Sequence, residues 1–311
     1  DRRSRPSSLP ARVAWVPEDG SMFRWWRKRK RARILADPFP DEWLRAIERD
    51  VALCRAVPEA SRPRLLDDAR LFIAERYWEP CGGIELTPSM CAVIAVQACV
   101  LTLGRSVDAF DHVRSILVYP TAYRAPDVWE DESGIVTEEL DDRDGEAWEW
   151  GSVVLSWQQV LVDSRTLHGR NLVLHELAHQ LDLLDTIDRP ALGDPELRAE
   201  RERWMDTFLA AHEAFCEQVD RGRRVKALDE YGAEDEAEFF AVATESFFER
   251  GAYLREHHPD LYRVLSEYYN QDPAGWTLPV AESGRRSETG RERRRRRRKE
   301  DRERRKAKGR Q

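Results

Sequence analysis

Apolar residues recur along most of this chain with the period of a helix and in a few short segments with the character of a strand. Spacings of three and four predict helices at about 41–56, 62–77, 172–185, 195–220, 235–250 and 259–269, with a first helix over 22–33. The apolar run "MCAVIAVQACVLTLG" (90–104) predicts a buried helix at 88–103. It is shorter than the ~20 residues of a membrane span, so we expect no membrane segment.

Strands are fewer. "RSILVYP" (114–120) and "GSVVLSW" (151–157) predict two strands, and "CGGIELT" (81–87) predicts a turn and a short third one. The acidic stretch between them, about 124–147, is punctuated by glycine and predicts a loop. A few strands among many helices indicate one α+β domain that is mostly helical with a small sheet. We expect this domain at 22–278, between a disordered extension at 1–21 and a disordered basic tail at 279–311.

Charge is distributed unevenly over the 311 residues, whose formal net charge is −7. Residues 285–311 carry 16 Lys and Arg against 5 Asp and Glu, so the rest of the chain has a net charge of −18. An acidic body is not typical of a nucleic-acid-binding domain, although the tail could contact nucleic acid. The basic segment 24–33 with Trp25 and Trp26 could contact nucleic acid or a membrane surface, or form an ordinary first helix. The five cysteines form no Cys-x-x-Cys pair, and the first residues show no apolar leader. These features predict a cytoplasmic protein.

The helix around "VLHELAHQLDLLD" (173–185) carries the candidate chemistry. His175 and His179 are four residues apart and therefore point the same way, so that two imidazoles can bind one metal ion. Glu176 lies beside them, where its carboxylate can reach a water on the metal without binding the metal itself. The opposite face is apolar and should be core, since it carries Leu174, Leu177, Leu181 and Leu184. This His-Glu-x-x-His pattern predicts a catalytic metal, with zinc as the expected ion.

A catalytic zinc requires a third protein ligand and an open position. Cys81 could complete a His/His/Cys site, as in peptide deformylases, but "PCGGIEL" lacks their flanking pattern. Glu238 and Glu245 are better candidates because they lie seven apart on one face of the helix 235–250. Its other face should be buried and holds Phe239, Val242, Ala243 and Phe247. Either glutamate could bind the metal while the other orients a ligand histidine. Asp182 is a further candidate for that orienting role.

Several separate motifs together resemble one family. "SILVYP", "VVLSW", "LHELAHQLDLLD" and "YGAEDEAEFFAVATESFF" are similar to the Mlc titration factor A family of zinc-dependent peptidases. "MFRWWRKRKRARILADPFPDEW" and "CGGIELT…IAVQACVLTLG" resemble the N-terminal part of that family, and the likeness runs from about residue 22 to residue 276. It implies a zincin-type domain similar to the catalytic domain of anthrax lethal factor.

The resemblance also implies roles for particular residues. One zinc ion per chain would be bound by His175, His179 and Glu238, with Glu176 as general base and Tyr231 as a catalytic-site tyrosine. The implied activity is hydrolysis of peptide bonds in a peptide or protein by a metal-activated water, with endopeptidase and aminopeptidase preference open. Of the two strands, we expect "GSVVLSW" to offer its edge to an extended substrate. The family name also implies an alternative role, capture of a transcriptional repressor as a regulatory partner.

Overall fold

The structure is a computed structural model that describes residues 21–130, 136–143, 145–148, 151–187 and 195–276. The predicted basic tail and all but the last residue of the predicted N-terminal extension lie outside these residues. The chain divides into two compact units, Asp1–Pro38 and Phe39–Gln311. In the first unit the described element is helix α1 (Ser21–Ile34). Within the described residues, no helix is long and apolar enough to cross a membrane.

The second unit begins with four helices, α2 (Asp41–Asp50), α3 (Ala52–Ala56), α4 (Arg62–Ala74) and α5 (Pro88–Thr102). The predicted helix at 41–56 is divided at Val51, whose backbone is extended. Helix α5 confirms the predicted buried helix. Thr87 caps it by accepting the Met90 N–H, and residues 91–102 are all buried. A helix that is apolar on every side has to be enclosed by its neighbours, and α2 and α4 pack against this one.

A small sheet has the strand order β1 (Tyr77–Pro80), β2 (Ser115–Tyr119), β6 (Ser152–Ser156) and β5 (Gly145–Trp148), and β1 lies between α4 and α5 in the chain. The first three strands are parallel, and β5 is antiparallel to β6. The predicted strand within 81–87 is wrong, because the strand precedes it. Gly82 and Gly83 have positive φ angles of 61° and 79°, a left-handed conformation that ends an extended segment.

The segment predicted as an acidic loop forms strands instead. β3 (Tyr123–Glu130) and β4 (Val136–Arg143) pair antiparallel, from Tyr123 opposite Arg143 to Glu130 opposite Val136. β5 then pairs with β6 along one side, while β2 pairs along the other. The expectation that "GSVVLSW" offers a free edge is therefore wrong, because both edges of β6 are used. Among the described strands of this sheet, β1 and β5 are the outer ones.

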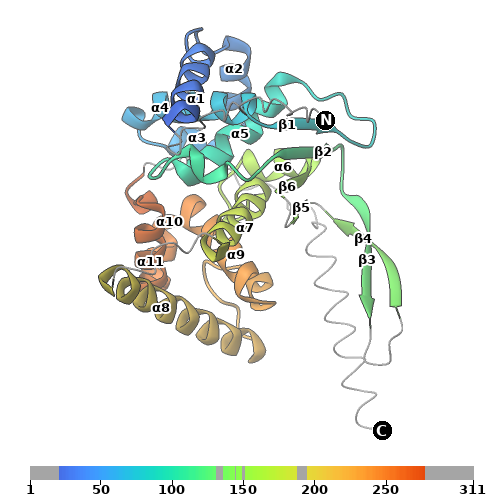
Figure 1. The fold of residues 1–311 in the computed structure, drawn as a ribbon. Helices are drawn as coiled ribbons and strands as arrows, with labels where there is room; N and C mark the ends of the chain where they lie inside the picture. Colours follow the sequence, from blue (N-terminus) through green and yellow to red (C-terminus); the bar gives the residue numbers. More distant parts are fainter. Residues whose placement is uncertain (1–20, 131–135, 144, 149–150, 188–194, 277–311) are drawn as a thin grey trace, which may run out of the picture. The chain divides into compact units, whose positions relative to one another are not determined.

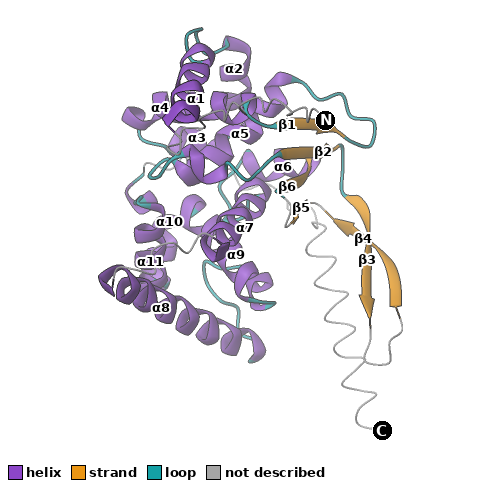
Figure 2. Cartoon of the chain, in the orientation of Figure 1, coloured by secondary structure: helices purple, strands orange, loops and turns teal. Residues whose placement is uncertain are grey.

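The rest of the unit is helical: α6 (Trp157–Ser164), α7 (Leu172–Ile187), α8 (Pro195–Asp220), α9 (Glu236–Glu249), α10 (Gly251–His257) and α11 (Pro259–Tyr269). Figure 1 locates these elements, and Figure 2 shows how helices predominate. The prediction did not include α6 or α10. Helix α7 packs against α5, α9, β5 and β6 and so lies at the centre of this unit. The mostly helical α+β class is confirmed.

Candidate metal centre

Helix α7 begins at a well-defined cap. Asn171 precedes it, and its side-chain oxygen accepts the Leu174 N–H at 3.1 Å. Leu174, Leu177 and Leu181 are at most 1% exposed, so the predicted apolar face is core. Leu184 lies where the structure does not describe side chains. Capping and packing thus fix both ends of the segment that carries the two histidines.

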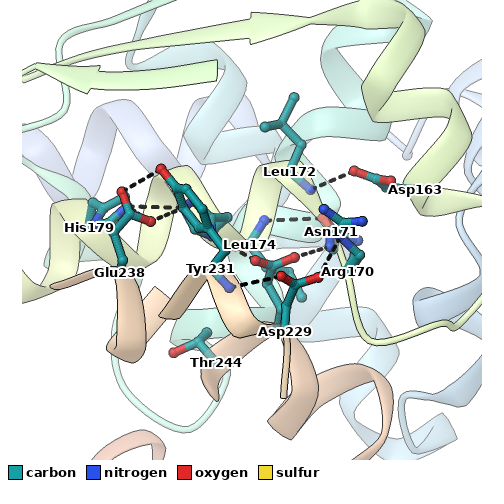
Figure 3. Close-up of polar contacts among 12 residues, drawn as sticks. Asp163, Arg170, Asn171, Leu172, Leu174, His179, Asp229, Tyr231, Glu238 and Thr244 are labelled. Atoms are coloured by element: carbon teal, nitrogen blue, oxygen red, sulfur yellow. Dashed lines mark hydrogen bonds and ion pairs between the residues drawn. The ribbon is translucent and has the colours of Figure 1, made fainter. Parts of the chain in front are cut away.

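Three side-chain atoms converge on the other face of α7. Nε2 of His175 lies 3.1 Å from Nε2 of His179 and 3.0 Å from Oε2 of Glu238. Nε2 of His179 lies 3.7 Å from the same oxygen. Figure 3 shows Glu238 reaching from α9 toward His179. The three residues form the one group of potential metal ligands found among the described residues, with all ligand atoms within 4.8 Å of one another.

Glu238 is held by its own helix end and by a tyrosine. Asp235 caps α9 and accepts the Glu238 N–H at 2.8 Å, which sets the carboxylate in the first helical turn. The Tyr231 hydroxyl donates to Oε1 of Glu238 at 3.0 Å. Burial by itself would raise the pKa of Glu238, but its contacts with His175 and His179 outweigh burial and hold the pKa far below its usual range. The carboxylate is therefore ionised and can act as a ligand.

The arrangement fits a metal ion. Oε2 of Glu238 is buried and accepts no well-formed hydrogen bond from the described part of the chain. Ligand atoms about 2.0–2.1 Å from a tetrahedral zinc ion lie roughly 3.3–3.4 Å apart, close to the spacings seen here. Two imidazoles and one carboxylate are also a donor set typical of catalytic zinc.

Glu245 contacts the other ring nitrogen of His175. Its Oε1 lies 2.6 Å from Nδ1 of His175, and its Oε2 accepts the Asn171 main-chain N–H. A carboxylate at Nδ1 places the imidazole proton there, which leaves the lone pair of Nε2 directed at Glu238 and His179. The sequence left the roles of the two glutamates interchangeable by periodicity. In the structure Glu238 faces both histidines, and Glu245 contacts one of them from behind.

Comparison with known proteins agrees with this geometry. Residues 23–270 match the family of glucose-regulated metallopeptidases M90. The chain belongs to this family, that of Mlc titration factor A. It is therefore a metallopeptidase by family, and the predicted resemblance is confirmed.

Two relatives carry that name. Mlc titration factor A of Serratia proteamaculans (strain 568) is 32% identical over 255 residues, which cover 81% of this chain and 94% of that protein. Mlc titration factor A of Escherichia coli O1:K1 / APEC is 30% identical over 255 residues, covering 81% and 93%. A protein of Synechocystis sp. without an assigned function is 32% identical over 252 residues, covering 80% and 89%. All the metal-ligand candidates of this M90 chain lie within the matched region.

Behind the metal centre, buried carboxylates accept the main-chain N–H groups that lead into α7. Oε2 of Glu249 accepts those of His168, Gly169 and Arg170 at 2.8–3.1 Å. Asp163 accepts the Leu172 N–H at 3.1 Å, a bond visible in Figure 3. Together with Glu245, these carboxylates satisfy five consecutive N–H groups. Because each of these N–H groups has an acceptor, the start of α7 is firmly held.

Sequence reasoning missed Glu249, Asp163 and Asn171. Asn171 alone had a readable signal, since asparagine just before an apolar helix is a typical cap. Glu249 is 1% exposed, and its Oε1 accepts a hydrogen bond from the Asn171 amide at 3.1 Å. Burial raises the pKa of Glu249 well above its usual value, even though the hydrogen bond from Asn171 opposes this shift.

The remaining candidates lie as follows. Glu176 follows His175 on α7 and is 4% exposed. Tyr231 is also buried, with its ring centre 6.0 Å from that of His175. Cys81 does not join the cluster, because its thiol lies beside β1 and contacts the Glu79 carbonyl and Tyr119. The side chain of Asp182 lies outside the described residues. The proposed third ligand is thus a glutamate rather than a thiolate.

Proposed function

We propose that this metallopeptidase is a zinc-dependent hydrolase of peptide bonds, with zinc held by His175, His179 and Glu238. The observation that carries the proposal is the convergence of two Nε2 atoms and one carboxylate oxygen within 3.0–3.7 Å. Zinc bound there supplies Lewis acidity, which polarises a peptide carbonyl and lowers the pKa of water toward ~7. Three protein ligands leave a coordination position open for the reactants, as catalysis requires.

The proton transfers fall to Glu176. Its carboxylate removes a proton from the attacking water and delivers it to the leaving nitrogen as the peptide bond breaks. Its position directly after His175 on α7 keeps it beside the ligands, and the site's low exposure strengthens electrostatic interactions there. Tyr231 donates a hydrogen bond to the oxyanion that forms on the former carbonyl, exchanging its present bond to Glu238 for it.

An extended substrate would lie along β5, in place of the strand predicted earlier. β5 is an outer strand of the sheet and packs against α7, and the edge that no described strand pairs with can add a further strand through main-chain hydrogen bonds. Such recognition reads main chain rather than side chains, so it suits many peptides. The five cysteines are odd in number and form no Cys-x-x-Cys pair, which is typical of a reducing compartment and supports a cytoplasmic location for these substrates.

Glu176→Gln tests the proposal. The variant should retain zinc and lose hydrolysis of a peptide library, because its three ligands survive and its base does not. His179→Ala should lose both zinc and hydrolysis. Libraries with free and with acetylated N-termini would separate aminopeptidase from endopeptidase action. Near-normal turnover by Glu176→Gln would show that this mechanism is wrong.

A second candidate function rests on the relatives' name, which describes titration of Mlc. By that analogy this chain would bind a transcriptional repressor through a surface outside the metal centre. The Glu176→Gln variant separates the two functions, because a binding role would survive the loss of the base. Repressor capture by wild type and Glu176→Gln alike would support the second function alongside the first.

A further inference from the structure

A cavity with a volume of about 640 Å³ lies beside the metal centre, and none of the three candidate metal ligands lines it. Three segments enclose it: residues 168–170 before α7, the loop 224–230 before Tyr231, and the start of α10 with Arg250 and Tyr253. Its volume is within the range of roughly 300–1,000 Å³ that small-molecule sites have. Size alone does not identify a ligand, but the charges around this cavity do.

Positive side chains dominate the lining. Arg224, Lys226 and Arg250 line the cavity and form no ion pair with any carboxylate in the described part of the chain. The acidic groups of the lining are already engaged. Asp229 contacts Arg170 at 3.5 Å and accepts the Tyr231 N–H at 3.0 Å, as Figure 3 shows, and Glu230 also has a partner. Three uncompensated cations therefore face one hollow space in a chain whose body is strongly acidic.

Arg250 is held in one orientation. Its guanidinium carbon lies 4.4 Å from the centre of the Tyr253 ring, a cation–π contact. Its side chain passes over Gly169, where an added Cβ would lie 2.7 Å from Cδ of Arg250. Gly169 also has a φ of +82°, so this position needs glycine for two reasons. A guanidinium fixed in this way is prepared for an oxygen-rich anion, because little side-chain entropy is lost on binding.

The loop that carries the other two cations is anchored. Val225 and Leu228 are buried, and the Lys226 carbonyl lies 2.9 Å from Nε2 of His258. Ala227, between Lys226 and Leu228, has a φ of +69°. This left-handed conformation is unfavourable for alanine and persists only where the surroundings impose it. Arg224 and Lys226 thus project from a backbone of defined shape.

The main chain just before α7 does not offer donors to this cavity. The N–H groups of His168, Gly169 and Arg170 all point at Glu249 and are therefore not available to a ligand. Any ligand would meet side-chain cations, which favour phosphate or carboxylate oxygens through charge-assisted hydrogen bonds. We propose that this cavity binds a small anionic molecule through a phosphate or carboxylate group held by Arg224, Lys226 and Arg250.

Calorimetric titration of the full chain with inorganic phosphate, and separately with acetate, at constant ionic strength tests this proposal. Wild type should bind one of these anions saturably, and the stronger of the two identifies the group recognised. Arg224→Gln with Lys226→Gln should weaken binding at least about tenfold, since two charge-assisted hydrogen bonds are lost. The matched control is Arg221→Gln with Arg223→Gln, which removes the same charge from two residues that precede this loop and do not line the cavity. Its affinity should stay within about threefold, because neither Arg221 nor Arg223 lines the cavity.

Three outcomes would overturn the proposal. Wild type could fail to bind either anion, or both double variants could bind as wild type does, which would assign binding to another basic segment such as the tail. Binding could instead vanish in His179→Ala and persist in Arg224→Gln with Lys226→Gln, which would place the anion at the metal. Since the readout is binding and not hydrolysis, the proposed peptidase mechanism stands or fails separately.

Discussion

Replacing Glu245 by glutamine tests how the second carboxylate supports the metal centre. The wild-type carboxylate serves two donors, Nδ1–H of His175 on one oxygen and the Asn171 N–H on the other. Glutamine has the same shape but presents one oxygen and one NH2 group. If the NH2 group faces Asn171, a buried N–H loses its acceptor. If it faces His175, Nδ1 must become the acceptor, and the ring proton moves to Nε2, where a metal should bind.

These two arrangements set the expected loss of stability and of zinc affinity in Glu245→Gln. A buried donor without a partner costs about 1–3 kcal/mol, and Glu245 is 1% exposed, so water cannot compensate. Losing a partner behind a metal ligand typically weakens metal binding or activity by about 10–100-fold. We therefore expect Glu245→Gln to lower the free energy of unfolding by about 1–3 kcal/mol and the zinc affinity by about 10–100-fold.

Glu249→Gln is the matched control. Glu249 lies one turn further along α9, belongs to the same buried network and does not contact either histidine. Zinc affinity would be measured by competition with a chromogenic chelator, and stability by urea unfolding of the metal-free chains. The control should lose stability to a similar degree and keep its zinc affinity. The reasoning would be refuted by wild-type zinc affinity in Glu245→Gln, or by equal weakening in both variants.

Three further predictions concern other parts of the chain. Tyr231→Phe should reduce kcat by about 10²–10³ at unchanged zinc content, as for a lost oxyanion donor; recovery at saturating zinc would instead make Tyr231 a group that orients Glu238. Burial raises the pKa of Glu249, so the folded chain keeps a proton that the unfolded chain releases, and stability should fall as pH rises from about 4.3 toward the folded-state pKa. Urea unfolding between about pH 5 and 8 should therefore show a flatter pH dependence for Glu249→Gln than for wild type, and identical slopes would contradict this assignment. Deleting the chain after Gly284 should leave turnover of a short peptide unchanged, because the family match ends at residue 270, and lost turnover would assign the tail to the catalytic unit.

Local sequence determined the helices that matter most for the site. The buried run that became α5 and the apolar face of α7 were readable because helical periodicity depends on residues only three or four apart. The same short range placed His175 and His179 side by side. It also put Glu238 and Glu245 on one face of α9, and the family motifs favoured Glu238.

Tertiary structure decided the rest. The contact between His175 and Glu245 spans 70 residues, and that between Asn171 and Glu249 spans 78 residues, distances over which no periodic pattern carries information. Strands β3 and β4 escaped prediction because their acidic residues resemble a loop until a partner strand pairs with them. The sequence by itself thus determined which residues could bind a metal. Only the packing of α7 against α9 decided which of them face one another, because side-chain partners across two helices depend on how the helices dock.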